Sequence, residues 1–298
     1  GGSLMQFTKS CKLLIKQLSG DDHNSLMDVA ENYCQRVLDK THPTLLCRFF
    51  FHFRREADGG NYVVMNSLLP NAAVDELYDL KGCADDKIVR KDGRSVSQIH
   101  KRWFMVHWLI AECSFGCCVP PNRVEYKNGK IAARNAVFRL PSDECSKVLK
   151  ASSLDVDFLR EGGLMDYSLL VGIINRPCED GSIPDFPSGG APGQPLVVVE
   201  DGVAKAYYIG IIDFLQGWTG GKKVAHVIKY LFAPKPISTI SPGPYAEQFI
   251  AANEHRFQTL PPQPTAKRAQ HASSRDVVDE EEEEESGEWA GDERPQKG

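Results

Sequence analysis

The stretch GLMDYSLLVGII (residues 163–174) decides the fold, because it places one carboxylate directly before a long apolar run. The run Leu169–Ile174 predicts a strand over residues 166–174. Asp166 stands at the entrance to this strand, where a carboxylate held by its packed neighbours can accept or orient the proton of a substrate hydroxyl. A cap at the strand start is the alternative, and the stretch taken alone favours that cap.

A second stretch, AYYIGIIDFLQGW (residues 206–218), has an acid at the other end of an apolar strand. The run Ile209–Ile212 ends in Asp213, and an acid in that position is costly unless it meets a metal ion, a hydrogen-bond donor or water. Metal ligation and a structural cap are equal alternatives for Asp213 from this pattern.

The segments around these two stretches predict a lobe of helix and strands. We expect a helix over residues 142–161 and strands over 166–174, 196–200 and 206–213. The intervening residues 177–195 contain five prolines and four glycines. This composition excludes regular structure and predicts a flexible insert.

Residues 1–70 predict a sheet with one helix. A hairpin is expected over residues 1–18, a helix over 24–39, and two paired strands around the turn ADGG (residues 57–60). Gly1, Gly2 and Ser3 lead into the hairpin, and its second strand carries Lys16. Backbone N–H groups of a glycine turn can lie over phosphates while a strand lysine reaches the same oxygens. An ordinary chain end is the alternative.

The stretch YDLKGC (residues 78–83) sets Asp79 and Lys81 two residues apart before a glycine. A charged surface turn is the simple interpretation. Two strand-end aspartates, a strand lysine and a glycine turn elsewhere in the chain together suggest magnesium-assisted phosphoryl transfer, and half of a phosphate site is the alternative interpretation of this stretch.

The stretch GGKKVAHVIKYL (residues 220–231) predicts one basic helical face. Lys222, His226 and Lys229 fall at helical spacing, with Lys223 beside them. This face can hold an anionic head group, and a solvated helix face is the alternative.

The composition is ordinary for a globular protein, and any contact with lipid would come from the water side. The formal net charge is -5, but the segment from Gln258 on carries eleven acids against five bases, so the remaining chain is close to neutral and no nucleic-acid partner is expected. Nine scattered cysteines indicate free thiols in a reducing compartment. The longest apolar run, WFMVHWLIA (residues 103–111), is too short to span a bilayer. We expect a cytoplasmic protein.

Six strings occur in the order and form of one family. They are VVMNSLLP (63–70), YDLKG (78–82), MDYSLLVGI (165–173), IGIIDFLQ (209–216), KKVAHVIK (222–229) and ISTISPGPYAEQF (237–249). On these strings the chain resembles the phosphatidylinositol phosphate kinases from Gly1 to about Phe257. The resemblance implies a two-lobed α+β fold like that of protein kinases, with antiparallel sheets and the ATP site in the cleft between the lobes.

The resemblance also implies a division of the chain. Residues 1–70 would form the N-terminal lobe, starting inside the glycine-rich loop of a longer protein. Residues 71–257 would form the C-terminal lobe, with the insert 177–195 and an activation-loop region at 213–242. Residues 258–298 are expected to be a disordered acidic tail.

The resemblance assigns roles to individual residues. Lys16 matches the lysine that binds ATP phosphates, Asp166 the catalytic aspartate, and Asp213 the aspartate that binds Mg²⁺. Lys81 matches a lysine near the transferred or substrate phosphate. Further contacts are expected with ATP at Gly1, Gly2, Ser3 and the hinge residues Met65 and Asn66, and with the anionic phosphoinositide membrane at Lys222, Lys223, His226 and Lys229. The protein would then be peripheral at the cytosolic face of membranes.

The chain departs from the family pattern at several positions. Cys83 replaces a serine, residues 84–86 (ADD) replace basic residues, Ala225 replaces a glutamate and Gln248 replaces an arginine. Residues 84–141 have no evident counterpart. These departures concern substrate preference and catalytic strength.

The activity implied is transfer of the γ-phosphoryl of ATP to a phosphatidylinositol monophosphate, with phosphatidylinositol 4-phosphate as the expected substrate and the 4,5-bisphosphate as the product. A soluble inositol polyphosphate kinase is one alternative, opposed by the glycine directly after Lys81 and by the ISTISP block. A catalytically weak phosphoinositide-binding scaffold is the other, favoured by Cys83, the shortened start and the unaligned middle. The sequence predicts no oligomeric state.

Overall fold

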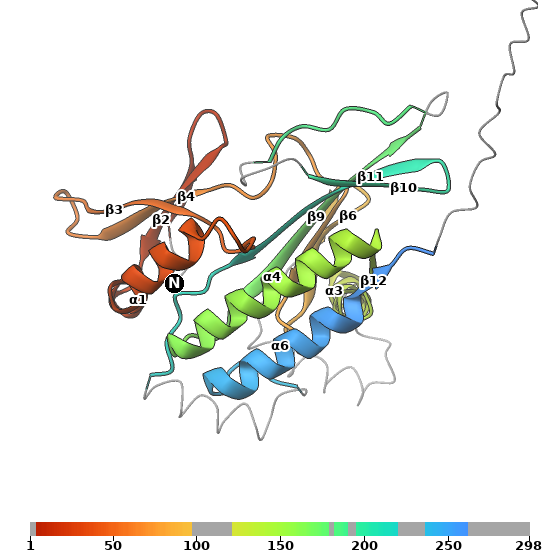
Figure 1. Ribbon diagram of the computed structural model, residues 1–298. Helices are drawn as coiled ribbons and strands as arrows, with labels where there is room; N and C mark the ends of the chain where they lie inside the picture. Colours follow the sequence, from red (N-terminus) through yellow and green to blue (C-terminus); the bar gives the residue numbers. More distant parts are fainter. Residues whose placement is uncertain (1–3, 97–120, 179–181, 190–194, 220–235, 262–298) are drawn as a thin grey trace, which may run out of the picture. The chain divides into compact units, whose positions relative to one another are not determined.

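Two antiparallel sheets form the framework of the chain (Figure 1). The computed structural model describes residues 4–96, 121–178, 182–189, 195–219 and 236–261. The smaller sheet has the strand order β1-β2-β4-β3, with β1 at Met5–Phe7, β2 at Leu13–Leu18, β3 at Phe49–Arg54 and β4 at Asn61–Asn66. The hairpin expected within residues 1–18 and the strands expected around ADGG are confirmed.

Helix α1 (Gly20–Leu38) connects β2 to β3. It begins after Ser19, whose hydroxyl accepts a hydrogen bond from the backbone N–H of Asp22 at 3.1 Å. Its apolar side buries Leu26, Val29 and Tyr33. The predicted helix over 24–39 is therefore confirmed, with an earlier start because the serine cap precedes the apolar pattern.

The larger sheet has six strands in the order β10-β11-β9-β5-β6-β7. Their bounds are β5 Glu76–Leu80, β6 Lys87–Lys91, β7 Arg94–Ser95, β9 Ser168–Pro177, β10 Leu196–Glu200 and β11 Val203–Ile212. Strand β9 pairs with both β11 and β5 and buries Leu169, Val171 and Ile173. The strands predicted in this part of the chain are confirmed, and β6 and β7 occupy the start of the segment that sequence patterns left unassigned.

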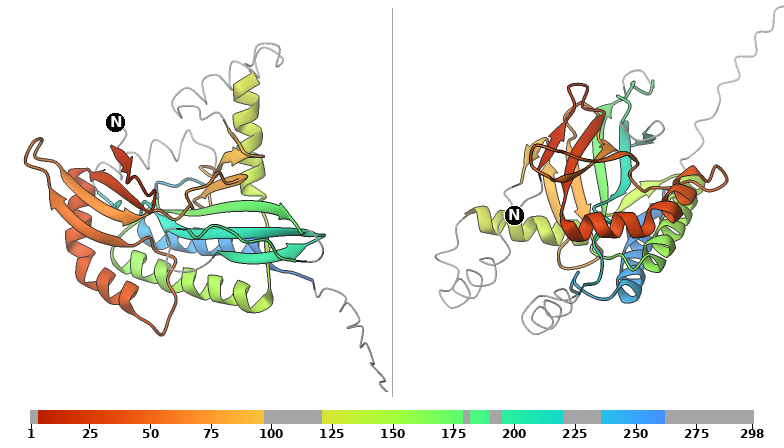
Figure 2. Two further views of the ribbon diagram at one scale, coloured as in Figure 1. Left: turned by 90° about the horizontal axis from the view of Figure 1, so that it is seen from above. Right: turned by 90° about the vertical axis from the view of Figure 1, so that its left-hand side faces the viewer.

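Helices α4 (Ser142–Glu161) and α6 (Pro242–Arg256) lie side by side on one face of the six-stranded sheet (Figures 1 and 2). The bounds of α4 are those predicted. Helix α3 (Pro121–Arg134) contacts β6. Strands β8 (Phe138–Leu140) and β12 (Phe257–Thr259) form a small parallel pair, so the expectation of antiparallel sheets holds for the two larger sheets and not for this one.

Two segments join the smaller sheet to the larger one. In the first, Leu46 forms a parallel bridge with Ile211, and the N–H of Cys47 donates to the carbonyl of Ile211 at 3.0 Å. In the second, the side chain of Leu68 lies against Gly210, where an added Cβ would come within 2.5 Å of it. A glycine is required there because any side chain would push this connection away from the sheet.

No described helix combines the length and the apolar character needed to cross a membrane. The expected insert (177–195) begins one residue too early, because Pro177 is the last residue of β9 and pairs with Val203. Residues 182–189 of the insert have neither helix nor strand, and the carbonyl of Pro187 accepts a hydrogen bond from the Tyr208 hydroxyl at 2.6 Å. The expected disordered tail starts too early, because Gln258 and Thr259 belong to β12 and pair with β8. Residues 262–298 lie outside the described residues.

Candidate active site

The pairing of three neighbouring strands brings three of the predicted site residues to one edge of the larger sheet. Leu80, the last residue of β5, lies opposite Leu169, and Ile212, the last residue of β11, lies opposite Ser168. Because β9 is antiparallel to both neighbours, its start meets the ends of β5 and β11. Lys81, Asp166 and Asp213 therefore follow or precede paired residues at the same edge.

Lys81 and Asp166 form the first ion pair of this edge. The ammonium of Lys81 donates to the Asp166 carboxylate at 2.7 Å and to the Asp166 carbonyl at 2.5 Å. Both side chains are mostly buried, with exposed fractions of 17% and 20%. Burial opposes the charge on Lys81, but Asp166 outweighs it, so the pKa of Lys81 lies above its ordinary value.

The backbone around Asp166 is fixed on both sides. Met165 and Tyr167 are fully buried. The N–H of Met165 donates to the carbonyl of Gln216 at 2.8 Å, and the hydroxyl of Tyr245 donates to the carbonyl of Tyr167. These anchors hold the Asp166 loop against the segment that follows Asp213 and against α6.

Lys16 and Asp213 form the second ion pair, and this one joins the two sheets. Lys16 lies in β2, and its ammonium donates to Asp213 Oδ1 at 2.6 Å. The lysine side chain is 15% exposed and the aspartate side chain 50% exposed. Within the described residues Lys16 is the hydrogen-bond partner of the Asp213 carboxylate, so much of that carboxylate faces solvent.

Phe214 anchors the residue after Asp213 in an aromatic cluster. Its ring centroid lies 5.9 Å from that of Tyr33 in α1 and 5.1 Å from that of Phe49 in β3. The Tyr33 hydroxyl donates to the Cys47 carbonyl and accepts from the N–H of Phe49, each at 2.8 Å. The cluster ties Asp213 to the smaller sheet and to α1.

Both site aspartates have left-handed backbone conformations. The φ angle is +64° at Asp166 and +57° at Asp213. Asp92 and Asp201 share this conformation, but each precedes a glycine in a tight hairpin turn, where it is usual. Asp166 and Asp213 precede Tyr167 and Phe214 instead, and such backbone strain is typical of functional sites.

The loop after Lys81 is packed against α6. Gly82 has a φ of +71°, and a Cβ there would lie 3.0 Å from the carbonyl oxygen of Gln248. Lys81 thus stands between Asp166 on one side and a loop held by α6 on the other.

Asp79, on the preceding strand, contacts Lys87 at 2.9 Å. Burial by itself would raise the pKa of Asp79, but the attraction to Lys87 has the larger net effect, so the pKa of Asp79 lies below its ordinary value.

A sequence model of the family described as phosphatidylinositol-4-phosphate 5-kinase matches residues 1–185 and 197–256. The chain belongs to the phosphatidylinositol phosphate kinase family. The resemblance drawn from the sequence strings is therefore confirmed.

Relatives in this family carry two different substrate names. Phosphatidylinositol 4-phosphate 5-kinase of Plasmodium falciparum is 24% identical over 287 residues, which cover 86% of this chain and 15% of the relative. Phosphatidylinositol 5-phosphate 4-kinase type-2 beta of Rattus norvegicus is 26% identical over 302 residues, with coverages of 83% and 65%. The type-2 alpha enzyme of Sus scrofa is 27% identical over 289 residues, with coverages of 80% and 64%. The chain spans less than two thirds of each of these relatives.

Cys83, where the family resemblance leads us to expect a serine, lies in the loop after Lys81. The side chain is buried, and its sulfur accepts a hydrogen bond from the N–H of Asp85 at 3.3 Å. Burial raises the pKa of the Cys83 thiol to about 12, so it stays neutral. A thiol can therefore act as the internal acceptor of this loop.

The remaining predicted residues are placed in part. Met65 and Asn66 are buried at the end of β4, and the Asn66 side-chain oxygen accepts from the N–H of Arg48 at 2.6 Å. The amide nitrogen of Asn66 has no partner among the described residues. The other predicted contacts lie outside the described residues: Gly1, Gly2, Ser3, Lys222, Lys223, His226 and Lys229.

Sequence patterns missed two groups that support the site. Phe214 follows the strand-end acid directly, and an aromatic residue at that position could have been recognised as an anchor. Asp86 and Arg256 form a buried ion pair behind Lys81, and they are 170 residues apart. No local pattern connects residues at such a separation.

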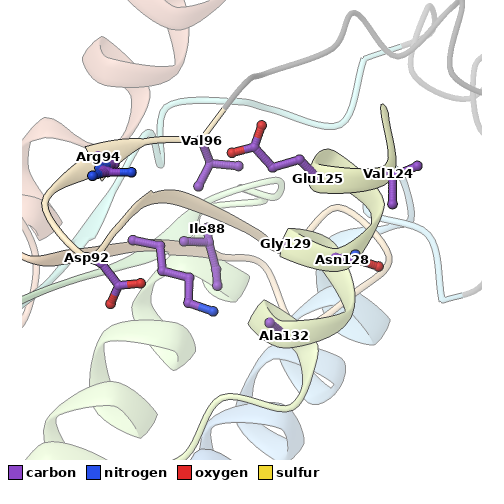
Figure 3. A pocket seen from close by; sticks show the side chains of 10 residues that line it. Ile88, Asp92, Arg94, Val96, Val124, Glu125, Asn128, Gly129 and Ala132 are labelled. Carbon is purple, nitrogen blue, oxygen red and sulfur yellow. The ribbon is translucent and has the colours of Figure 1, made fainter. Parts of the chain in front are cut away.

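A cavity of about 980 Å³ lies elsewhere, between the β6–β7 hairpin and α3 (Figure 3). Its walls combine apolar residues such as Ile88 and Val124 with the charged residues Lys91, Asp92, Arg94 and Glu125. The four residues of the candidate site do not line this cavity, so it is separate from the site; they are Lys16, Lys81, Asp166 and Asp213.

The Asp213 carboxylate fits the chemistry of a magnesium site. Mg²⁺ is bound through one or two carboxylates and keeps several waters. A half-exposed carboxylate with one oxygen engaged by Lys16 provides such a ligand.

Proposed function

We propose that this chain transfers the γ-phosphoryl of ATP to a free hydroxyl of the inositol ring of a phosphatidylinositol monophosphate. The observation that carries the proposal is the position of two lysine–aspartate pairs at one edge of the larger sheet, which brings positive charge and carboxylates together. Phosphoryl transfer depends on positioning and on neutralising charge, and these side chains supply both.

Each of the four residues has a separate task in the proposed reaction. The inositol oxygen forms a bond to the γ-phosphorus while the bond from that phosphorus to the bridging oxygen of ADP breaks. Asp166 orients the hydroxyl and takes its proton. Lys81 offsets the negative charge of the transferred group, and Lys16 holds the ATP phosphates. Asp213 would hold Mg²⁺, which supplies additional positive charge at the phosphate oxygens.

The two sheets would form the two lobes of a kinase-like arrangement. We propose that ATP lies between them, with Met65 and Asn66 at the hinge and Gly1, Gly2 and Ser3 over the phosphates. The Lys16–Asp213 contact between the sheets supports this arrangement, because both partners have phosphate-related roles in the family resemblance.

We propose phosphatidylinositol 4-phosphate as the substrate and its 5-hydroxyl as the acceptor. The description of the matching family model and the name of the Plasmodium relative support this choice. The 5-phosphate 4-kinases among the relatives make the 5-monophosphate the main competing substrate.

The proposed substrate is part of a membrane, so the chain would act as a peripheral protein at an anionic surface. Lys222, Lys223 and Lys229 would each contribute about 1 kcal/mol near such a surface. His226 lies at helical spacing from two of them and would join the same contact.

The test is ATP-dependent labelling of vesicles that carry, separately, the 3-, 4- or 5-monophosphate of phosphatidylinositol. Asp213→Asn is the inactive variant, because asparagine tolerates the left-handed backbone. Asp201→Asn is its matched control. Asp201 also has a positive φ, but it lies in the β10–β11 turn, away from the site.

We expect product from the 4-monophosphate, lost in Asp213→Asn and retained in Asp201→Asn. Product from the 5-monophosphate alone would support the proposed kinase activity but overturn the choice of phosphatidylinositol 4-phosphate as the substrate. Absence of product from all three lipids would overturn the proposed function.

A further inference from the structure

A buried carboxylate stands directly behind Lys81. Asp86 is almost fully buried, and its Oδ1 accepts hydrogen bonds from the backbone N–H of Lys81 at 2.6 Å and from that of Cys83 at 3.4 Å. Its other oxygen, Oδ2, accepts from the guanidinium of Arg256. Both carboxylate oxygens are thus engaged.

Arg256 brings this contact to the last turn of α6. The guanidinium is buried and also donates to the side-chain oxygen of Asn253 at 3.4 Å. The backbone of Lys81 is therefore connected through one carboxylate to a helix on the face of the sheet, while its ammonium is held by Asp166.

Neighbouring contacts reinforce the same loop. The N–H of Ala84 donates to the carbonyl of Pro236 at 2.8 Å, and the hydroxyl of Ser238 donates to Asp85 at 2.7 Å. Three polar contacts, one each from Pro236, Ser238 and Arg256 of α6, thus hold the five residues that follow Lys81.

We infer that Asp86 and Arg256 are positioning residues that set the place of the Lys81 ammonium for phosphoryl transfer. This inference rests on the proposed function. A buried ion pair stabilises a fold poorly, because removing both charges from water offsets much of their attraction. A contribution to stability therefore does not explain why Asp86 and Arg256 are buried here. A need for an acceptor that fixes the backbone N–H of Lys81 does explain why an aspartate occupies this position of the loop.

The chain contains a matched ion pair that does not contact Lys81. Asp155 of α4 is fully buried, and its carboxylate accepts from Arg36 at 2.8 Å and from the N–H of Leu45 at 2.6 Å. The two clusters share an aspartate, an arginine and a backbone N–H. In both clusters the arginine Nε is buried without a partner among the described residues. Asp155→Asn is therefore the control for Asp86→Asn.

The first experiment measures thermal unfolding, kcat and KM for ATP in both variants, at a temperature well below their unfolding midpoints. Both should unfold at lower temperature than the wild type. Asp86→Asn should lower kcat at least tenfold and leave KM for ATP within about threefold, because Lys16 remains in place. Asp155→Asn should keep kcat within about threefold of the wild type. Equal kcat values in the two variants would overturn the inference.

The second experiment follows the position of Lys81 without using activity. Acetylation of lysines by an N-hydroxysuccinimide ester is measured by mass spectrometry, with Lys16 as the internal reference. Lys81 should be modified several-fold faster in Asp86→Asn and at the wild-type rate in Asp155→Asn. An unchanged rate in Asp86→Asn would contradict the inference, even in a chain that proved inactive on every lipid.

Arg256→Lys provides a second variant that keeps the charge opposite Asp86. It should fold, and Lys81 should be modified faster because the shorter hydrogen-bonding group cannot reproduce the guanidinium contact. If Asp86→Asn does not fold, wild-type modification of Lys81 in Arg256→Lys would overturn the inference.

Discussion

The two ion pairs of the candidate site are built differently. Lys81 and Asp166 both come from the edge of the larger sheet, and both are mostly buried. Lys16 and Asp213 come from different sheets, and half of the Asp213 side chain is exposed. We call Lys81–Asp166 the closed pair, because it is mostly buried and belongs to one sheet. We call Lys16–Asp213 the open pair, because its carboxylate is half exposed and it joins two sheets.

This difference separates the roles of the two carboxylates. Breaking a buried pair leaves an uncompensated charge, and the penalty for that is large. Breaking a pair whose carboxylate is half exposed costs less, because water around that carboxylate already weakens the attraction between the two charges. Asp166 should therefore affect both stability and activity, while Asp213 should affect activity alone.

The largest effect is expected for Asp213→Asn. Loss of a metal-binding carboxylate should lower kcat about a thousandfold or more, since charge stabilisation is a dominant part of catalysis. The free energy of unfolding should change by less than about 1 kcal/mol. Vesicle labelling and urea unfolding measure the two quantities, and a loss of stability as large as that of Asp166→Asn would refute the comparison.

Phe214→Ala tests whether the open pair depends on its aromatic anchor. Removing a buried phenylalanine should lower the free energy of unfolding by about 3–5 kcal/mol. Phe214→Leu keeps most of the volume and should cost about half as much. Chemical denaturation compares the two, and a near-neutral Phe214→Ala would show that the Tyr33 and Phe49 contacts do not hold this segment.

Asp166→Asn tests the closed pair. It leaves the buried Lys81 ammonium without its carboxylate and should lower the free energy of unfolding by about 3 kcal/mol, together with loss of activity. Asp201, like Asp166, has a positive φ. Asp201→Asn should change the free energy of unfolding by less than about 0.5 kcal/mol. If both variants unfolded at the same denaturant concentration, the buried pair would have no special energetic role.

The smallest effect concerns Asp79, which pairs with Lys87 beside the closed pair. Its pKa is lower in the folded chain than in the unfolded one, so its contribution to stability is present above the unfolded pKa of about 3.9 and is lost as the pH falls through the folded value. Asp79→Asn should therefore be less stable than the wild type by about 1 kcal/mol at pH 7, with the difference shrinking toward pH 3. Unfolding curves across this range measure it, and a difference independent of pH would contradict the assignment.

Much of the site could be predicted because its residues adjoin apolar strands. Asp166 and Asp213 were found at the two ends of such strands, and the strands are confirmed as β9 and β11. The bounds of α4 were also predicted, because its helical pattern is long and regular. Asp86 was interpreted only as a departure from the family pattern, because its buried partner Arg256 belongs to a distant helix.

The sequence by itself determined the α+β class, the main strands and helices, and the charged residues at the strand ends, because these depend on periodicities within short segments. Only the tertiary structure decided which charges meet. Lys16 reaches Asp213 across 197 positions, and Lys81 reaches Asp166 across 85. The same holds for the burial of one carboxylate and the exposure of the other, since burial is set by the packing of strands and helices that are remote in the chain.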